Sequence, residues 1–412
     1  MKQVLIFCLL AGLFITSASG GEFQVNTHTT WDQADPDIAI DANSGFVVVW
    51  RSYGQDGSSN GIFGQRFDPN NSYSGDEFQV NSNVTGNQTE PAVAIDAAAG
   101  FIVTWRGPGI TDPNRDDIFA RWFDPNNVPV TDEIQVNDDS LGRHICPAIA
   151  TDQDGGCAIV WESVDFPQEG DMTICGRLFD GTGMMLGEEF IIGGEMSGCR
   201  YPDVAMDSNG NFAVVWMTDK SSNSIMAQLF NADGSDKTEP FEVNTTVFNS
   251  ITQPSIAIDG TGCFIVTWDG DPNLASMDDI HARIFDPNGT ALCEQFIVNT
   301  TIDQAQQNPH VAMNGPGEFV IVWESRIDPN VNERDIFCRR FDCTGEPVGD
   351  ELQLNATIEA DQRSPAVAMG SDGRFVTVWQ SDEQDGSRFG IFGCSDFILE
   401  PEVPVDNGLI DE

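Results

Sequence analysis

Seven Trp residues recur at nearly fixed spacing in this chain of 412 residues, and that period constrains the fold more than any other feature. Successive members lie 52 to 56 residues apart: Trp50, Trp105, Trp161, Trp216, Trp268, Trp323 and Trp379. A Pro stands 14 residues before each Trp: Pro36, Pro91, Pro147, Pro202, Pro254, Pro309 and Pro365. A Phe follows each Trp after 14 to 18 residues. Such self-similarity identifies a repeat protein.

Each copy reads as four short β-strands. In the first copy an apolar run at 36–41 leads through an Asp-to-Gly turn into FVVVW at 46–50, and further strand patterns follow at 61–68 and 77–80. The runs are apolar on both sides, as expected for sheets covered on both faces. A four-stranded unit of this length matches a propeller blade, whereas immunoglobulin-like domains need about 100 residues each. The sequence therefore predicts an all-β, seven-bladed β-propeller with antiparallel blades.

The two ends of the repeat region complement each other. Residues 21–26, GEFQVN, match the fourth strand of a copy but have no copy before them, while the last copy ends after its third strand near Phe397. The N-terminal strand is therefore expected to complete the last blade and close the ring. The predicted division is a signal peptide at 1–20, a single propeller at 21–397 and an acidic, flexible tail at 398–412.

The first 20 residues predict export. Lys2 precedes an apolar run from residue 4 to 15, and small residues follow, which is the layout of a cleavable signal peptide. A spanning helix is the competing reading, but it needs about 20 apolar residues. We therefore expect a secreted protein, extracellular or periplasmic. Nine Cys remain after cleavage, an odd number, and Cys146 with Cys199 is the first disulfide pair to test.

Charge limits the partners. The chain has 65 Asp and Glu against 19 Lys and Arg, for a net charge of −46. A polyanion such as nucleic acid would be repelled, so nucleic-acid binding is excluded as a function. Hydrophobic residues make up 40% of the chain, enough for a folded core. We expect a monomer with no membrane span.

Length differences between copies concentrate in the loop from the second to the third strand. These loops share one face with the connections between copies and lie at 53–60, 107–116, 163–170, 218–223, 270–278, 325–334 and 381–388. Variable loops on a constant scaffold commonly carry function, so this face is the candidate binding surface for carbohydrate or protein. Trp31 lies on the same face and can stack on a ligand or pack under a loop. Four glutamines three residues before a repeated Pro can present amides to a ligand or bond the loop backbone: Gln33, Gln88, Gln306 and Gln362.

Two sets of acids have competing interpretations. Five copies carry an Asp five residues after the Pro: Asp41, Asp96, Asp152, Asp207 and Asp259. They form either an acidic ring at the channel or Asx turns, and their repetition favours turns, because catalysis needs an acid and a base tuned apart. The second set lies in loops rich in the oxygen ligands of Ca²⁺, although without EF-hand spacing: Asp112, Asp116, Asp117, Asp269 and Asp271.

Enzyme signatures are absent from the sequence. It has no HExxH, no P-loop and no GxSxG with a matching His and Asp, and its four His fall at different points of different copies. The favoured prediction is a binding propeller without catalysis. The alternative is a propeller glycoside hydrolase or polysaccharide lyase using carboxylates at the channel mouth, and a structural cell-surface protein is the third hypothesis.

The repeat EFQVN…P-x-[IV]-A-x-D…G-F-V-V-V-W…I-F-x-x-R-F-D resembles repeats of large exported bacterial proteins, often found beside calcium-binding RTX or cadherin-like modules. The resemblance covers about residues 21–397 and implies an extracellular propeller. This chain carries no RTX nonapeptides and no large appended domain. Calcium binding or adhesion therefore does not follow from the resemblance.

Overall fold

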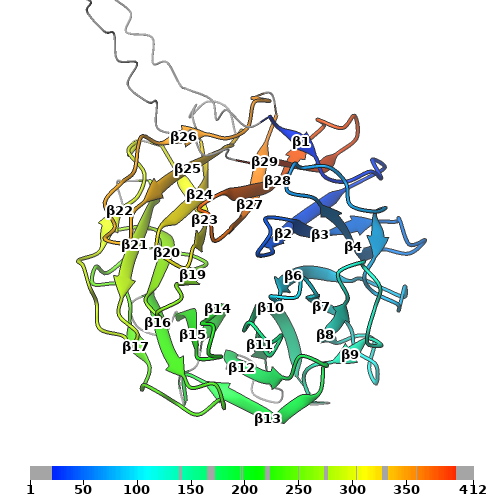
Figure 1. Cartoon of the computed structure of the whole chain (residues 1–412), viewed down its shortest axis with the longest axis horizontal. Coiled ribbons are helices and arrows are strands. Elements are labelled where there is room, and N and C mark those ends of the chain that lie inside the picture. Colours follow the sequence, from blue (N-terminus) through cyan, green and yellow to red (C-terminus); the bar gives the residue numbers. More distant parts are fainter. Residues whose placement is uncertain are drawn as a thin grey trace, which may run out of the picture.

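A computed structural model describes residues 21–138, 142–164, 172–194, 196, 198–218, 223–248, 250–272, 277–302, 304–326, 333–358 and 360–395. Seven antiparallel sheets surround a central axis (Figure 1). The described residues contain strands and no helix, so none of them forms a helix that could cross a membrane. The predicted all-β, seven-bladed propeller is confirmed.

Six blades place their strands in chain order from the axis outward. Blade 1 holds β2 (Gln33–Ile40), β3 (Phe46–Tyr53), β4 (Asn60–Phe67) and β5 (Phe78–Gln79). Blade 2 holds β6 (Thr89–Ile95), β7 (Phe101–Pro108), β8 (Asp116–Phe123) and β9 (Ile134–Gln135). Blade 3 holds β10 (Arg143–Thr151), β11 (Cys157–Val164), β12 (Met172–Phe179) and a longer outer strand, β13 (Met185–Ile192). Blade 4 holds β14 (Cys199–Met206), β15 (Phe212–Thr218), β16 (Ser224–Phe230) and β17 (Phe241–Glu242).

Blade 5 has a divided inner strand, β18 (Ser250–Ile251) and β19 (Ser255–Ile258), followed by β20 (Phe264–Asp271), β21 (Asp279–Phe285) and β22 (Phe296–Ile297). Blade 6 holds β23 (Gln306–Met313), β24 (Phe319–Ser325), β25 (Asp335–Phe341) and β26 (Leu352–Gln353). Blade 7 combines β27 (Gln362–Met369), β28 (Phe375–Asp382) and β29 (Phe389–Ser395) with the N-terminal β1 (Phe23–Gln24).

The ring is closed by β1, as the sequence predicts. It pairs antiparallel with β29, placing Phe23 opposite Gly393. The Phe23 ring also packs against blade 1, with centroid distances of 6.1 Å to Phe46 and 5.5 Å to Phe67. The N-terminal strand therefore belongs to the last blade and contacts the first. The predicted signal peptide and tail lie outside the described residues.

The apolar core lies between blades. Seven buried clusters each combine residues of two neighbouring blades. Strand alternation explains this arrangement, because Val48 and Trp50 of β3 face blade 7 while Val47 and Val49 face blade 2. All seven repeated Trp are fully buried, and each packs against the preceding blade. The regular spacing of Trp in the sequence thus corresponds to one large buried side chain at each interface between blades.

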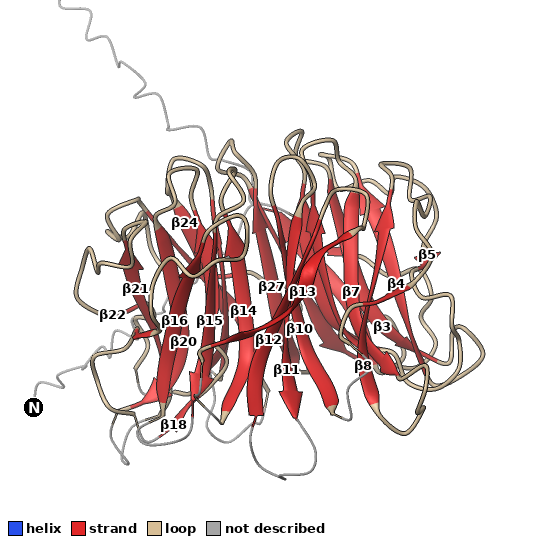
Figure 2. Cartoon of the chain, turned by 90° about the horizontal axis from the view of Figure 1, so that it is seen from below, coloured by secondary structure: helices blue, strands red, loops and turns tan. Residues whose placement is uncertain are grey.

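Side chains of Asp close the inner hairpins. Asp41 Oδ1 accepts the N–H groups of Asn43 at 2.8 Å and Gly45 at 3.0 Å. The same pair of bonds recurs in four further blades, at Asp96, Asp152, Asp207 and Asp259. These acids therefore form Asx turns, the structural alternative for the repeated Asp. Seen from the side, loops gather at two opposite faces of the ring (Figure 2).

The face with the loops between second and third strands, such as β3 to β4, and with the connections between blades is called the mouth face below. The Asx turns lie on the opposite face, since strand direction alternates within a blade. Cys146 carries a free thiol, so the predicted disulfide with Cys199 is not formed. The fold depends instead on packing between blades and on strand closure.

Replacing Phe23 with Ala should lower the free energy of unfolding by about 3 kcal/mol, because the ring fills the contact between the closing strand and blade 1. Urea unfolding followed by Trp fluorescence measures the change. Trp31→Ala is the control, since that ring is 53% exposed and its removal leaves no comparable void. An unchanged unfolding midpoint for F23A would show that closure through β1 does not stabilise the ring.

Candidate functional site

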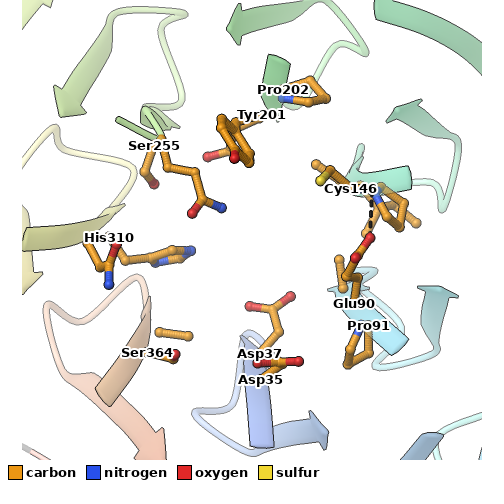
Figure 3. A pocket seen from close by; sticks show the side chains of 18 of the residues that line it. Asp35, Asp37, Glu90, Pro91, Cys146, Tyr201, Pro202, Ser255, His310 and Ser364 are labelled. Atoms are coloured by element: carbon orange, nitrogen blue, oxygen red, sulfur yellow. Dashed lines mark hydrogen bonds between the residues drawn. The ribbon is translucent and has the colours of Figure 1, made fainter. Parts of the chain in front are cut away.

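A cavity of about 520 Å³ lies on the propeller axis. The inner strands line it with the repeated Pro and the residues on either side of each Pro. Figure 3 shows side chains from several blades, among them Asp35, Asp37, Glu90 and His310, pointing into this space. The channel is therefore lined by residues that differ from blade to blade within a common backbone.

A bulge at each Pro turns these side chains inward. In blade 1 the register with β3 shifts between Ala34 and Asp37, and Asp35 adopts φ of 53°. Left-handed φ of 51° to 56° occurs at the residue before Pro in six blades: Asp35, Glu90, Cys146, Tyr201, Asn308 and Ser364. Such backbone is unfavourable for residues with a Cβ, so the bulge must be held by its surroundings. Blade 5, whose inner strand is divided, is the exception.

Two of the channel acids are neutralised within their own blades. Arg51 Nε lies 2.5 Å from Asp35 Oδ2, and Arg106 Nη1 lies 2.7 Å from Glu90 Oε1. Both Arg directly follow a repeated Trp. No Lys or Arg lines the cavity itself, which is formed entirely by described residues. The channel is therefore an acidic space whose remaining charges come from the residues after the Pro.

The remaining ionisable groups, those directly after the Pro, are Asp37, Asp203 and His310, from blades 1, 4 and 6. Each also accepts a backbone N–H of the next blade: Asp37 Oδ2 from Val93 at 2.8 Å, Asp203 Oδ2 from Ile256 at 2.9 Å, and His310 Nδ1 from Val367 at 3.3 Å. The bond to Nδ1 assigns the proton of the neutral ring to Nε2. One side of each group is thus fixed by the scaffold.

Burial in the channel wall raises the pKa of both carboxyls. For Asp37 and Asp203 loss of solvent is the main cause, and the nearby imidazole of His310 partly offsets it. Two carboxyls of raised pKa beside one imidazole are an asymmetric set of proton donors and acceptors. Such a set can bind a polar ligand or transfer protons.

Sequence reasoning missed this set. It considered the fifth residue after each Pro, which repeats, instead of the first, which reads Asp, Ala, Ala, Asp, Ser, His and Ala around the ring. The available signal was that the residue type changes from copy to copy directly after a Pro that is the same in every copy. That these side chains face one another follows only from closure of the ring.

The four predicted glutamines are buried, with exposed fractions of 0 or 1%. Gln306 and Gln362 accept the indole N–H groups of Trp323 and Trp379 at 2.8 and 2.9 Å. Gln33 donates to the Thr30 carbonyl, and Gln88 donates to the Thr85 carbonyl. Their amides hold the Trp and the connections between blades, which agrees with the second of the two roles considered from the sequence.

Trp31 is accessible on the mouth face. Its ring is 53% exposed and meets the 46% exposed ring of Tyr53 edge to face, with centroids 6.3 Å apart. Trp31 precedes Asp35 of the channel wall by four residues. The two rings form an aromatic platform beside the channel mouth, and Tyr53 was not singled out from the sequence.

The five acids predicted for calcium do not form one site. Asp116 Oδ2 pairs with Arg106 and Arg143, at 2.8 and 2.6 Å, and Asp117 Oδ1 accepts the Asn137 amide at 2.9 Å. Asp112 lies in a surface loop beside Arg115. These three belong to blade 2, whereas Asp269 and Asp271 belong to blade 5. Among the residues that the structure describes, no group of three acidic, His or Cys side chains could hold a metal ion. Calcium binding stays a prediction.

Asp269 is fully buried beside Trp268. Its Oδ1 accepts the hydroxyl of Thr252, while its Oδ2 is buried without a hydrogen-bond partner. Burial raises the pKa of this carboxyl from 3.8 to about 7. A neutral Asp269 is therefore the form that the fold favours.

The closed ring and its axial cavity define the class: the protein is a seven-bladed β-propeller. No protein-family model and no curated protein matches the chain. Solved structures do match. The polysaccharide lyase Uly1 is 10% identical, with a TM-score of 0.55 over 90% of this chain and 91% of its own. An ulvan lyase of polysaccharide lyase family PL25, bound to GlcA(1-4)Rha3S, is 10% identical, with a TM-score of 0.53 over 92% and 94%.

A Dyadobacter fermentans protein of unknown function is also 10% identical, with a TM-score of 0.53 over 92% of this chain and 98% of its own. At these identities the likeness shows the fold alone. Each of the three structures aligns with at least 90% of this chain, so the likeness extends over nearly the whole ring.

The raised pKa of Asp269 predicts a dependence of stability on pH. Its folded pKa of about 7 exceeds the ordinary 3.8, so the stability it contributes is present below pH 4 and is lost as pH rises to about 7. Asp269→Asn removes this loss, and the difference in unfolding free energy between variant and wild type should grow by about 1.4 kcal/mol per pH unit in that window. Urea unfolding at a series of pH values measures it.

Asp112→Asn is the control for that series, because backbone N–H groups lower the pKa of this exposed carboxyl. Its difference from wild type should not increase with pH between 4 and 7. Parallel curves for D269N and wild type would contradict the assignment of a neutral Asp269.

Proposed function

We propose that the protein binds a saccharide on its mouth face, with the ligand reaching from the aromatic platform into the axial channel. The exposed Trp31–Tyr53 pair is the observation that carries the proposal. Aromatic faces stack on sugar rings, and two large rings exposed side by side are otherwise unfavourable in water. The platform belongs to blade 1, whose Asp35 and Asp37 enter the channel wall.

The charge of the site favours a neutral or cationic saccharide. The channel lining offers Asp37 and Asp203 but no Lys or Arg, and the chain has a net charge of −46. Carboxylated or sulfated polymers would meet repulsion at every approach. Carboxylates and the Nε2–H of His310 instead suit the hydroxyl groups of a neutral sugar, which both donate and accept hydrogen bonds.

Similar structures support a carbohydrate ligand. Two of the matching propellers are polysaccharide lyases by description, and one of them was solved with a saccharide bound. Export from the cell, which residues 1–20 predict, would bring this protein into contact with extracellular glycans. The proposal retains the binding role predicted from the sequence and selects carbohydrate over protein.

Removing either ring of the platform should weaken saccharide binding. For Trp31→Ala or Tyr53→Ala we expect affinity to fall about fivefold, since each ring contributes stacking energy of about 1 kcal/mol. A glycan array identifies the ligand, and calorimetry with the best hit measures the affinity. Val130→Ala, at a 60% exposed position in blade 2 after β8, is the control. Full affinity in both ring variants would contradict the platform.

Acid–base catalysis on a saccharide is the second candidate function. The specific observation is the asymmetric set of Asp37, Asp203 and His310, with two raised carboxyl pKa values. One carboxyl can donate a proton to a leaving oxygen while the other, when ionised, accepts one, and the Nε2–H of His310 can donate a hydrogen bond to the substrate. Catalysis would use the same channel that the binding proposal assigns to the ligand.

Cleavage of a polysaccharide tests this second function. If catalysis occurs, Asp37→Asn and His310→Gln should each lower the rate by about 100-fold or more while binding persists. Incubation with neutral polysaccharides, followed by assays for new reducing ends and for unsaturated products, measures the rate. Asp41→Asn, in a hairpin on the opposite face, is the control. If the wild type releases no product from glycans that it binds, binding alone remains.

A further inference from the structure

A second cavity, of about 610 Å³, lies at the seam where blade 7 meets blade 1. Its walls come from the connection that follows β1 and from blade 1, including Gln55, Gln65, Tyr73, Asp76 and Glu77. None of these residues lines the axial channel. We call this cavity the seam pocket.

The repeat explains why the seam is open. Blades 2, 3, 5 and 6 carry an Arg at the position of Gln65: Arg121, Arg177, Arg283 and Arg339. In blade 3 the guanidinium of Arg177 pairs with Asp138 at 2.6 Å. In blades 2, 5 and 6 the guanidinium crosses the interface, and its Nη1 donates to a carbonyl at the end of the preceding outer strand, that of Val80, Val243 or Val298, at 2.8 to 2.9 Å. Each also lies over a Phe ring, with centroid distances of 5.4 to 5.7 Å. Three interfaces therefore contain a bound guanidinium.

Gln65 is too short to make this crossing. Its Nε2 donates to the carbonyls of Arg66 at 2.9 Å and Gly75 at 3.0 Å. The Gly75 carbonyl corresponds to those of Thr131 and Cys293, which accept Nε of Arg121 and Arg283. The Gln65 amide thus makes the bond that Arg Nε makes in blades 2 and 5. Both of its N–H groups are used, so neither is left for the neighbouring blade. The Tyr73 hydroxyl crosses this seam instead and donates to the Gln24 carbonyl at 3.0 Å, and the seam pocket lies beside it.

The polar atoms of this pocket need donors. Gln65 is 0% exposed, and its Oε1 is buried without a hydrogen-bond partner. The Oε1 of Gln55 is likewise buried and unpartnered. Buried acceptors are normally satisfied, so two in one cavity point to a missing donor. Asp76 and Glu77 add negative charge, and the two oxygens of Glu77 already accept hydrogen bonds from Thr27 and Gln55. The half-exposed ring of Tyr73 adds an aromatic wall.

We propose that the seam pocket binds the guanidinium group of an external ligand. A guanidinium is planar, permanently charged and carries only donors, which complements two amide oxygens, two carboxylates and an aromatic face. The three internal Arg show that the same place in the repeat accepts this group. The ligand completes at this interface the contact that the chain makes for itself elsewhere.

Binding of two probes tests the proposal: agmatine, and a capped Gly-Arg-Gly peptide. Calorimetry or NMR titration with full-length mature protein should give saturable binding of at least one probe, whereas the matching Gly-Glu-Gly peptide should not bind. Tighter binding of the peptide assigns the ligand to Arg side chains of proteins, and tighter binding of agmatine assigns it to small guanidino compounds. No saturable binding of either probe would overturn the proposal.

Gln65→Arg supplies the missing group from the chain itself. It should abolish probe binding and raise the melting temperature, as a tethered ligand would. Gln228→Arg is the matched control in blade 4, where Gln228 Oε1 already accepts the Gly193 N–H at 3.0 Å and no acceptor is left over. It should lower the melting temperature and leave probe binding intact. If Q65R folds and still binds either probe, the assignment of the guanidinium to the seam pocket is contradicted.

Gln65→Met keeps the proposal falsifiable if Q65R does not fold. It retains the volume but removes the acceptor, so probe affinity should fall about tenfold. Unchanged affinity in Q65M would place the guanidinium elsewhere. Saccharide binding on the mouth face should persist in all three variants, because they lie outside the axial channel and the aromatic platform.

Discussion

Packing between neighbouring blades is the interaction on which the structure depends. A four-stranded sheet of this size has two apolar faces and no core of its own, so each blade becomes stable only when both faces are covered. The repeated Trp supplies the largest side chain of each interface and is fully buried in every blade. A linear stack would leave two faces uncovered. A ring covers all of them, and pairing of β1 with β29 joins its ends.

Closure of the ring creates the channel and brings together side chains that differ from blade to blade. Six inner strands that bulge at the repeated Pro, together with the divided inner strand of blade 5, bring seven pairs of side chains to one axis, although each blade alone would expose them on separate edges. Identical residues there would form a ring of equal groups. Substitution at the position after the Pro instead places Asp37, Asp203 and His310 where the other blades carry Ala or Ser. The scaffold needs the Pro and the bulge but tolerates any neighbour, which leaves these positions open to function.

The acidic charge has two roles in this architecture. Many carboxylates accept backbone N–H groups in the turns, and such bonds lower the pKa of Asp68, Asp124 and Asp286 on the surface. These acids repeat because the turns repeat. Asp37 and Asp203 of the channel are half-buried, have raised pKa values and do not repeat. Composition alone cannot separate the two groups, since both count equally toward the net charge of −46.

The sequence by itself determined the blade number, the strand order and the closing strand, because each is written as a local pattern repeated along the chain. It also indicated the Asx turns, whose partners lie within four residues. It could not place Gln306 under Trp323, pair Arg106 with Glu90, or bring Asp37 near His310, since these contacts join distant parts of a blade or different blades. Only the tertiary structure decided which side chains share the axis and which interface without an Arg leaves a pocket. Ring closure sets those distances, and no local pattern encodes it.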